Sequence, residues 1–353
     1  GPVGEAGEDP KTLGFEVNIA GCAYGQPGSY YGEDGYGNLN PKRKKRAVPG
    51  LEAYHRTDTF LSEALTREAK TAIDASLKAQ KPFFLYMAHY AVHSPFQADP
   101  RFSQNYDDSA KPKNAQAFAT LIEGIDQSLG DLIDHVREKE VAENTFILFV
   151  GDNGSDAPLG DTDGYSSSAP LRAKKGTCYE GGIRVPFIAA WAKPSDSSNH
   201  PIPAGTVHQQ MGTVMDLFPT ILDLTGTAHP TAHPVDGVSL LPQFADDINP
   251  DRPDFFLCHF PHSHRSSYFT SYRQGDWKLI YRYREGRKRN GREPLPTYEL
   301  YNLRTDPYET SNLAENESVR LSSLMTAMVS RLEAENAQFP EDEDGRPLLP
   351  LIP

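Results

Sequence analysis

Phe146-Ile-Leu-Phe-Val-Gly-Asp152-Asn153-Gly154 is an apolar run of strand length that ends abruptly in an Asp-Asn-Gly turn. A run without polar interruption is typical of a strand that is buried on both faces of a parallel sheet. The turn places a carboxylate and an amide oxygen just beyond the strand, and Ca²⁺ and Mg²⁺ prefer such ligands. In isolation, the same turn is more often a structural cap of the strand.

Amphipathic helices and apolar strands alternate on both sides of this run. The spacing of apolar residues predicts helices over residues 59–79 and 114–139, and strands over 83–88 and 187–191. We therefore expect an α/β fold with a mostly parallel central sheet flanked by helices. A further short strand is expected at 14–21 in an otherwise irregular amino-terminal part.

Polar side chains follow the ends of two of these predicted strands. Asp152 and Asn153 follow one, and His89 and His93 follow the other. Ligands of open α/β sheets bind beyond the carboxyl ends of the strands, so this placement favours a functional site. His93, which precedes Ser-Pro, could donate a proton or a hydrogen bond to an anion. A purely structural histidine is an equal alternative, and His89 is the weaker candidate.

The character of the sequence changes near residue 250. After a predicted helix over 211–224, interrupted at Pro219, the apolar residues begin to alternate, which predicts an antiparallel sheet. The alternating segments are 255–260, 267–273, 276–283 and 297–303. A helix is expected over 316–334. We interpret residues 1–249 as part of the α/β domain and residues 250–353 as a smaller subdomain with an antiparallel sheet and a helix.

Residues 171–187 form a glycine-rich segment that leads back into a strand. Its Lys175, before Gly-Thr, is a compact positive charge that suits a sulfate or phosphate oxygen. Taken alone, such a lysine is more often a surface residue. For Arg172, Glu180 and Arg184 we favour a structural ion network.

A second group of polar residues lies in the sequence Cys258-His-Phe-Pro-His-Ser-His-Arg265. Transition-metal binding is conceivable in a histidine cluster, but no cysteine pair supports it. We prefer a role for His262, His264 and Arg265 in lining a substrate pocket.

The overall composition excludes some classes of protein. The net charge is −13, which argues against nucleic acid as the main partner. No apolar run approaches the length of a membrane span. Three cysteines are too few for a disulfide scaffold. The basic run Lys42-Arg-Lys-Lys-Arg46 could be a localisation or protease signal, but we favour a solvated loop.

Several motifs, in order along the chain, resemble those of the type I sulfatases of the alkaline-phosphatase-like superfamily. They span about residues 14–335 and are Phe83-Phe-Leu-Tyr-Met-Ala-His-Tyr-Ala-Val-His-Ser-Pro95, Gly151-Asp-Asn-Gly154, Ala169-Pro-Leu-Arg172, Lys175-Gly-Thr-Cys-Tyr-Glu-Gly-Gly-Ile-Arg-Val-Pro186, Val235-Asp-Gly-Val-Ser-Leu-Leu-Pro242, Gly275-Asp-Trp-Lys-Leu-Ile280 and Glu299-Leu-Tyr-Asn-Leu-Arg-Thr-Asp-Pro-Tyr-Glu309. The resemblance implies a hydrolase of sulfuric esters with one divalent cation, usually Ca²⁺ and alternatively Mg²⁺. By motif, Asp152 and Asn153 are metal ligands, Lys175 contacts the sulfate, and His93 contacts the sulfate or protonates the leaving alcohol.

The resemblance also implies a nucleophile that this sequence does not contain. In the family a Cys or Ser within Cys/Ser-x-Pro-x-Arg is oxidised to formylglycine, and it precedes the position of Gly14-Phe15. Ser168-Ala-Pro-Leu-Arg172 fits this pattern but lies where the family has an ordinary Pro-Leu-Arg segment. We expect the nucleophile and two further metal ligands in an amino-terminal fragment outside residues 1–353, without which this chain is inactive.

Three functions follow as expectations. The first is a sulfatase that acts on a sulfated sugar or an aryl sulfate, located by family analogy in the periplasm or secreted. The second is a phosphoester or phosphonate hydrolase of the same superfamily, which a different nucleophile segment would indicate. The third is an inactive truncated remnant that binds anionic glycans.

Overall fold

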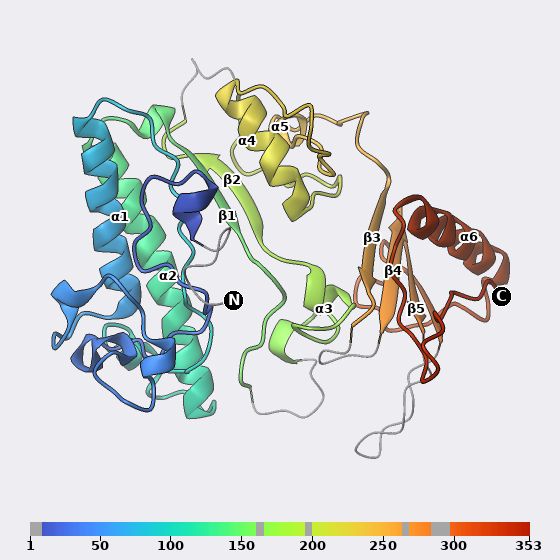
Figure 1. The fold of residues 1–353 in the computed structure, drawn as a ribbon, viewed down its shortest axis with the longest axis horizontal. Helices are drawn as coiled ribbons and strands as arrows, with labels where there is room; N and C mark the ends of the chain where they lie inside the picture. Colours follow the sequence, from blue (N-terminus) through green and yellow to red (C-terminus); the bar gives the residue numbers. More distant parts are fainter. Residues whose placement is uncertain (1–8, 160–165, 195–199, 263–267, 284–296) are drawn as a thin grey trace. The chain divides into compact units, whose positions relative to one another are not determined.

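The computed structural model describes residues 9–159, 166–194, 200–262, 268–283 and 297–353 (Figure 1). These residues form two compact units. Unit 1 comprises Gly1–Thr145 with Ala157–Gly160, and unit 2 comprises Phe146–Asp156 with Asp161–Pro353. The domain boundary expected near residue 250 lies inside unit 2 and stays a prediction.

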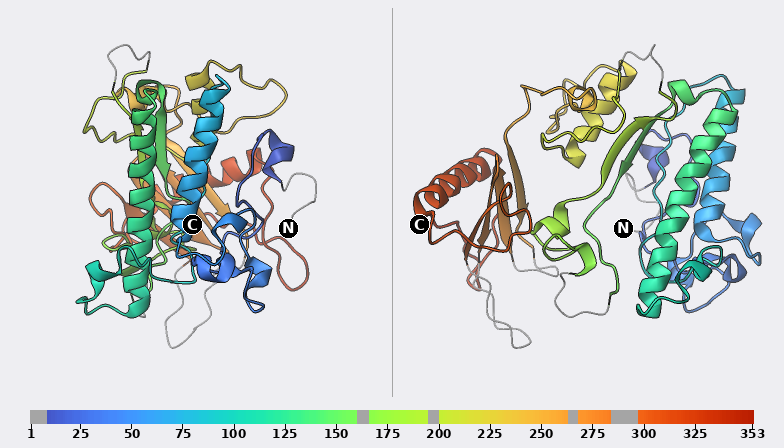
Figure 2. Two further views of the ribbon diagram at one scale, coloured as in Figure 1. Left: turned by 90° about the vertical axis from the view of Figure 1, so that its left-hand side faces the viewer. Right: turned by 180° about the vertical axis from the view of Figure 1, so that it is seen from behind.

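Unit 1 is built on two long helices that lie side by side, α1 (Leu61–Lys78) and α2 (Lys113–Glu138) (Figures 1 and 2). Both helices were predicted from their apolar stripes, and both are confirmed. The unit also contains short 3-10 helices, η1 (Pro10–Leu13), η2 (Gly32–Gly37), η3 (Lys44–Arg46), η4 (Glu52–Tyr54), η5 (Ser103–Tyr106) and η6 (Ala142–Asn144). The core of the unit is aromatic and aliphatic, with the ring of Tyr30 stacked 5.5 Å from that of Phe60.

Two strands predicted in unit 1 do not form. Residues 14–21 bend irregularly after η1, and residues 83–88 carry no strand ladder. Phe84 and Tyr86 are 61% and 72% exposed, so the segment keeps the two-residue alternation of a strand. A strand also needs a neighbour to share its hydrogen bonds, and no other described segment pairs with 83–88.

Unit 2 begins with β1 (Phe146–Val150), which pairs with β2 (Phe187–Trp191). The pairing is antiparallel, with Phe146 opposite Trp191 and Val150 opposite Phe187. In the described parts of the chain every strand pair is antiparallel, so the expected mostly parallel sheet is not found there. An apolar run does not specify the direction of the neighbouring strand, and β1 is only partly buried, which explains the difference.

The middle of unit 2 holds short helices: η7 (Ser166–Ser168), α3 (Glu180–Ile183), η8 (Val214–Asp216), α4 (Leu217–Thr225) and α5 (Leu241–Phe244). The helix expected over 211–224 is found only as η8 and α4, and the interruption expected at Pro219 does not occur. Pro219 lies in the first turn of α4, where the backbone N–H groups have no partner within the helix, so proline is tolerated.

The carboxyl-terminal part of unit 2 is the predicted antiparallel sheet. It contains β3 (Phe255–Phe260), β4 (Phe269–Gln274), β5 (Trp277–Arg282) and β6 (Tyr298–Asn302), in that order, and α6 (Ser318–Ala334) covers one face. Leu279 and Tyr281 of β5 pack toward α6. Lys278 and Arg282 therefore point to the opposite face, because side chains alternate along a strand.

No helix in the described part of the chain combines the length and apolarity needed to cross a bilayer.

Candidate active site

The Asp-Asn-Gly turn follows β1 and is held in place by its backbone. The Gly151 N–H donates to the Pro186 carbonyl at 3.0 Å, and the Gly154 N–H donates to the Gly182 carbonyl at 2.9 Å. A Cβ on Gly154 would lie 1.9 Å from the Gly181 carbonyl oxygen, so only glycine permits this approach. The turn is thus packed directly against the glycine-rich segment.

The segment that carries Lys175 adjoins the same turn. The Lys175 N–H donates to the Ser155 carbonyl at 3.1 Å, and the Gly181 N–H closes the loop onto the Arg172 carbonyl at 2.9 Å. The structure therefore brings three of the predicted site residues, Asp152, Asn153 and Lys175, onto two hydrogen-bonded turns of unit 2.

Lys175 differs from the other cations of its loop. Lys174 forms an ion pair with Asp156 at 3.0 Å, and Arg184 lies 4.0 Å from Glu180. The half-buried Lys175 ammonium has no carboxylate partner among the described residues. An unpaired, partly desolvated ammonium attracts anions, so this lysine can bind an anionic ligand without first giving up an ion pair.

The ion network predicted for Arg172, Glu180 and Arg184 is confirmed in part: Arg184 approaches Glu180, whereas Arg172 pairs with the carboxyl-terminal sheet. Arg172 lies 3.4 Å from Glu299 of β6 and donates to the Glu309 carbonyl at 2.8 Å. Its guanidinium also stacks over the Tyr179 ring at 3.8 Å. Arg282 of β5 pairs with the other oxygen of Glu299.

A lysine that the sequence analysis did not single out lies at the centre of this network. Lys278 is 1% exposed, and its ammonium lies 2.8 Å from both Glu180 and Glu309. Burial disfavours the ammonium, but the two carboxylates outweigh burial, and the pKa of Lys278 is raised. Burial raises the pKa of Glu309, and the charge of Glu180 raises it further, against the lowering by Lys278. The single ammonium of Lys278 therefore compensates the charge of two carboxylates.

The cysteine within the glycine-rich segment is not suited to nucleophilic chemistry. Cys178 is buried, and burial raises the pKa of its thiol to about 11. The hydroxyl of Ser168 has a structural role, because it donates a hydrogen bond to the Gly181 carbonyl at 2.8 Å. Neither side chain is therefore a good candidate for a nucleophile.

His93 belongs to unit 1 and is exposed. Its Nδ1 lies 3.1 Å from the Ser94 carbonyl, and its own carbonyl accepts a hydrogen bond from the Tyr30 hydroxyl at 2.7 Å. The loop around it is therefore firmly attached to the core of unit 1. Burial lowers the pKa of the His89 imidazole to about 4, so near neutral pH this ring is not in the protonated, imidazolium form.

Of the predicted substrate-pocket residues, only His262 lies within the described residues. It is exposed, and its ring packs edge-on against Phe260 at 5.5 Å. His264 and Arg265 lie outside the described residues. His259, from the same segment, is structural, because its two ring nitrogens bond to the Thr270 hydroxyl and the Gln338 carbonyl, each at 2.7 Å.

The oxygen donors at the turn suit a hard cation. Asp152 is exposed, and no other described residue engages its carboxylate. Asn153 donates through Nδ2 to the Gly154 carbonyl at 3.0 Å, which leaves its Oδ1 available as a ligand. Two oxygens are fewer than such an ion requires, and the described residues contain no group of three or more acidic, histidine or cysteine side chains around a common point. Calcium binding stays a prediction.

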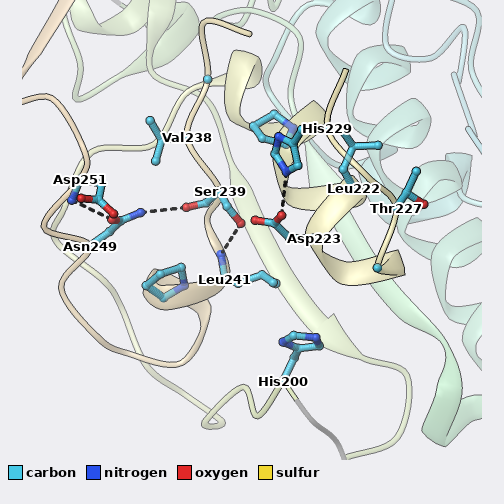
Figure 3. Close-up of a pocket in the computed structure, with 14 residues that line it drawn as sticks. His200, Leu222, Asp223, Thr227, His229, Val238, Ser239, Leu241, Asn249 and Asp251 are labelled. Carbon is cyan, nitrogen blue, oxygen red and sulfur yellow. Dashed lines mark hydrogen bonds and ion pairs between the residues drawn. The ribbon is translucent and has the colours of Figure 1, made fainter. Parts of the chain in front are cut away.

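A cavity of about 650 Å³ in unit 2 lies apart from these residues (Figure 3). Its wall includes His200, Asp223 and His229, and none of the predicted site residues lines it. His229 Nε2 lies 2.7 Å from Asp223. Burial works to raise the pKa of Asp223, but hydrogen bonds from His229 and Ser239 outweigh it, and the pKa is lowered. The hydrogen bonds of Asp223 are thus made within the protein, so the cavity is a weaker candidate for the active site than the two turns.

The profile of the sulfatase family matches residues 20–227, and that of the N-sulphoglucosamine sulphohydrolase carboxyl-terminal region matches residues 173–338. The chain belongs to the sulfatase family. The N-acetylgalactosamine-6-sulfatase of Canis lupus familiaris is 36% identical over 196 residues, which cover 56% of this chain and 35% of that protein. A sulfatase of Formosa agariphila is 30% identical over 301 residues, which cover 79% of this chain and 50% of that protein.

The fold agrees with this assignment. The crystal structure of Ps i-CgsB matches with a TM-score of 0.67 and 24% identity over 92% of this chain and 67% of that chain. The same protein has been solved in complex with k-i-k-neocarrahexaose. This sulfatase chain therefore has the sulfatase-like α/β fold, and it spans half or less of the length of the two curated relatives described above.

Proposed function

We propose that the protein carrying this chain is a sulfuric ester hydrolase that releases sulfate from a sulfated sugar. The observation that carries the proposal is the unpaired Lys175 on a turn bonded to the oxygen-rich turn at Asp152 and Asn153. The relatives named for N-acetylgalactosamine 6-sulfate and the neighbour solved with neocarrahexaose support a carbohydrate substrate. By analogy with the family, we propose a periplasmic or secreted location.

Each residue has a separate task in the proposed reaction, in which an ester and water give an alcohol, sulfate and a proton. Asp152 and Asn153 hold the divalent cation, which supplies Lewis acid polarisation of the sulfate when bound. Lys175 neutralises a sulfate oxygen and stabilises the charge that develops as the S–O bond breaks. For His93 both roles that the resemblance implies stay open, a contact with the sulfate or proton transfer to the leaving alcohol oxygen. The formylglycine nucleophile is proposed to lie outside residues 1–353.

The test compares two esters of the same sugar. Protein containing the expected amino-terminal fragment, with formylglycine verified by mass spectrometry, is incubated with N-acetylgalactosamine 6-sulfate and, separately, with the 6-phosphate. Sulfate release measured by ion chromatography supports the proposal. Faster phosphate release would favour the phosphoester hydrolase, and the absence of turnover for either ester and for a sulfated galactan would refute hydrolysis.

The metal assignment makes a prediction that does not depend on turnover. Asp152→Ala should weaken calcium binding at least ~10-fold, because it removes a charged oxygen ligand. The measurement is isothermal titration with CaCl₂. Asp156→Ala is the matched control, since its carboxylate lies on the same stretch of chain but pairs with Lys174. Equal affinity in the wild type and the Asp152 variant would refute the ligand assignment.

A further inference from the structure

The basic run at residues 42–46 forms an ordered turn on unit 1. Lys44–Arg46 make up η3, and the Arg43 N–H donates to the Asn40 carbonyl at 2.9 Å. The Gly28 N–H bonds to the Arg46 carbonyl and ties the turn to a neighbouring segment. A Cβ on Gly28 would lie 2.8 Å from the Arg43 carbonyl oxygen, so glycine allows this close packing. These backbone contacts hold the turn, and none of them involves the side chain of a lysine.

The five cations of the run divide into two sets. Arg43 and Arg46 point back to the protein, Arg43 to Asp34 at 3.8 Å and Arg46 to the Gln26 side chain. Lys42, Lys44 and Lys45 are exposed and have no carboxylate partner among the described residues. Three unpaired ammonium groups thus lie within four positions on one exposed turn.

This concentration of positive charge is unusual in a chain with a net charge of −13. Like charges at such short spacing repel one another, and the backbone bonds of the turn do not require them. A ligand that bears several negative charges would relieve the repulsion and release counterions. The turn is therefore a candidate surface for a polyanion.

We propose that Lys42, Lys44 and Lys45 bind a sulfated polysaccharide chain. Ammonium groups act as point charges and suit sulfate groups spaced along a flexible polymer. Single-stranded nucleic acid would also need exposed aromatic rings on which bases stack, and residues 40–47 contain none. This surface goes beyond the proposed hydrolytic site, because it would hold the polymer rather than react with it.

The test measures binding without turnover. Wild-type protein is titrated with a carrageenan of defined length, with unsulfated agarose oligosaccharides as the uncharged control. Lys44→Gln with Lys45→Gln should weaken carrageenan binding about tenfold at low salt, and should flatten the dependence of affinity on salt. Lys44→Arg with Lys45→Arg should retain binding, because the positive charges remain.

The matched control is Lys111→Gln with Lys113→Gln, which removes the same charge from exposed positions of the same unit. This control should leave carrageenan affinity unchanged. An equal loss in both double variants would overturn the assigned surface, as would equal affinity for agarose or tighter binding of single-stranded DNA. In the protein that contains formylglycine, release of sulfate from a small monoester should be the same in all variants, so failure of this proposal and failure of the hydrolase proposal give different results.

Discussion

Lys278→Ala should destabilise unit 2 by ~3–5 kcal/mol, because removal of one partner leaves the other charges buried and uncompensated. The lysine is 1% exposed and lies 2.8 Å from both Glu180 and Glu309, so two carboxylates would lose their shared cation. The free energy of unfolding is measured by urea denaturation. The two tryptophans of the chain, Trp191 and Trp277, both lie in unit 2 and report its unfolding alone.

Further variants separate charge from packing. Lys278→Met keeps most of the volume and should destabilise nearly as much, because the carboxylates remain unpaired. Adding Glu180→Gln and Glu309→Gln to Lys278→Met should recover much of the loss. Lys139→Ala removes an exposed lysine that lies 2.9 Å from Asp74 in unit 1, and it should leave the transition unchanged. If Lys278→Met were as stable as the wild type, the ion cluster would have no structural role.

The sequence predicted elements whose periodicity is local. Helix α1 was expected over 59–79 and is found at Leu61–Lys78, and the four strands of the carboxyl-terminal sheet lie within three residues of their predicted ends. Each of these elements buries one face, so the spacing of its apolar residues records the burial directly. The order of the motifs along the chain predicted membership of the sulfatase family, which the profile matches confirm.

Features that depend on distant partners were predicted less well. Residues 83–88 have the composition of a strand, but a ladder requires a second segment, which no local pattern specifies. The antiparallel pairing of β1 with β2 was missed for the same reason. Lys278 could have been noticed as a cation between apolar residues of a strand, but its partners lie 98 and 31 positions away in the sequence.

The ion network was predicted only in part, because one of its partners is also distant in the sequence. Arg172, Glu180 and Arg184 were expected to form a structural ion network. The structure confirms the pair between Arg184 and Glu180, but Arg172 finds its carboxylate at Glu299, 127 positions away. Ion pairs with residues of β5 and β6 therefore hold the loop in place, and the position of Lys175 in that loop depends on them.

Lys175→Ala should lower the turnover of the formylglycine-containing protein by at least ~10²-fold, the scale of losing one group that stabilises developing charge. Its ammonium has no carboxylate partner among the described residues, so its charge is available to the sulfate. Lys174→Ala is the matched control, because that lysine is already paired with Asp156 at 3.0 Å. The control should retain nearly full turnover.

Two further measurements separate a contact with sulfate from a structural role. Lys175→Ala should weaken the binding of inorganic sulfate while calcium affinity and the urea transition stay unchanged, because the side chain has no partner within the described fold. Lys175→Arg should recover only part of the turnover, since a planar guanidinium keeps the charge but does not reproduce the compact geometry of an ammonium. Turnover near that of the wild type in Lys175→Ala would contradict the sulfate contact. Parallel losses of turnover and stability would instead assign Lys175 to the fold, alongside Lys278.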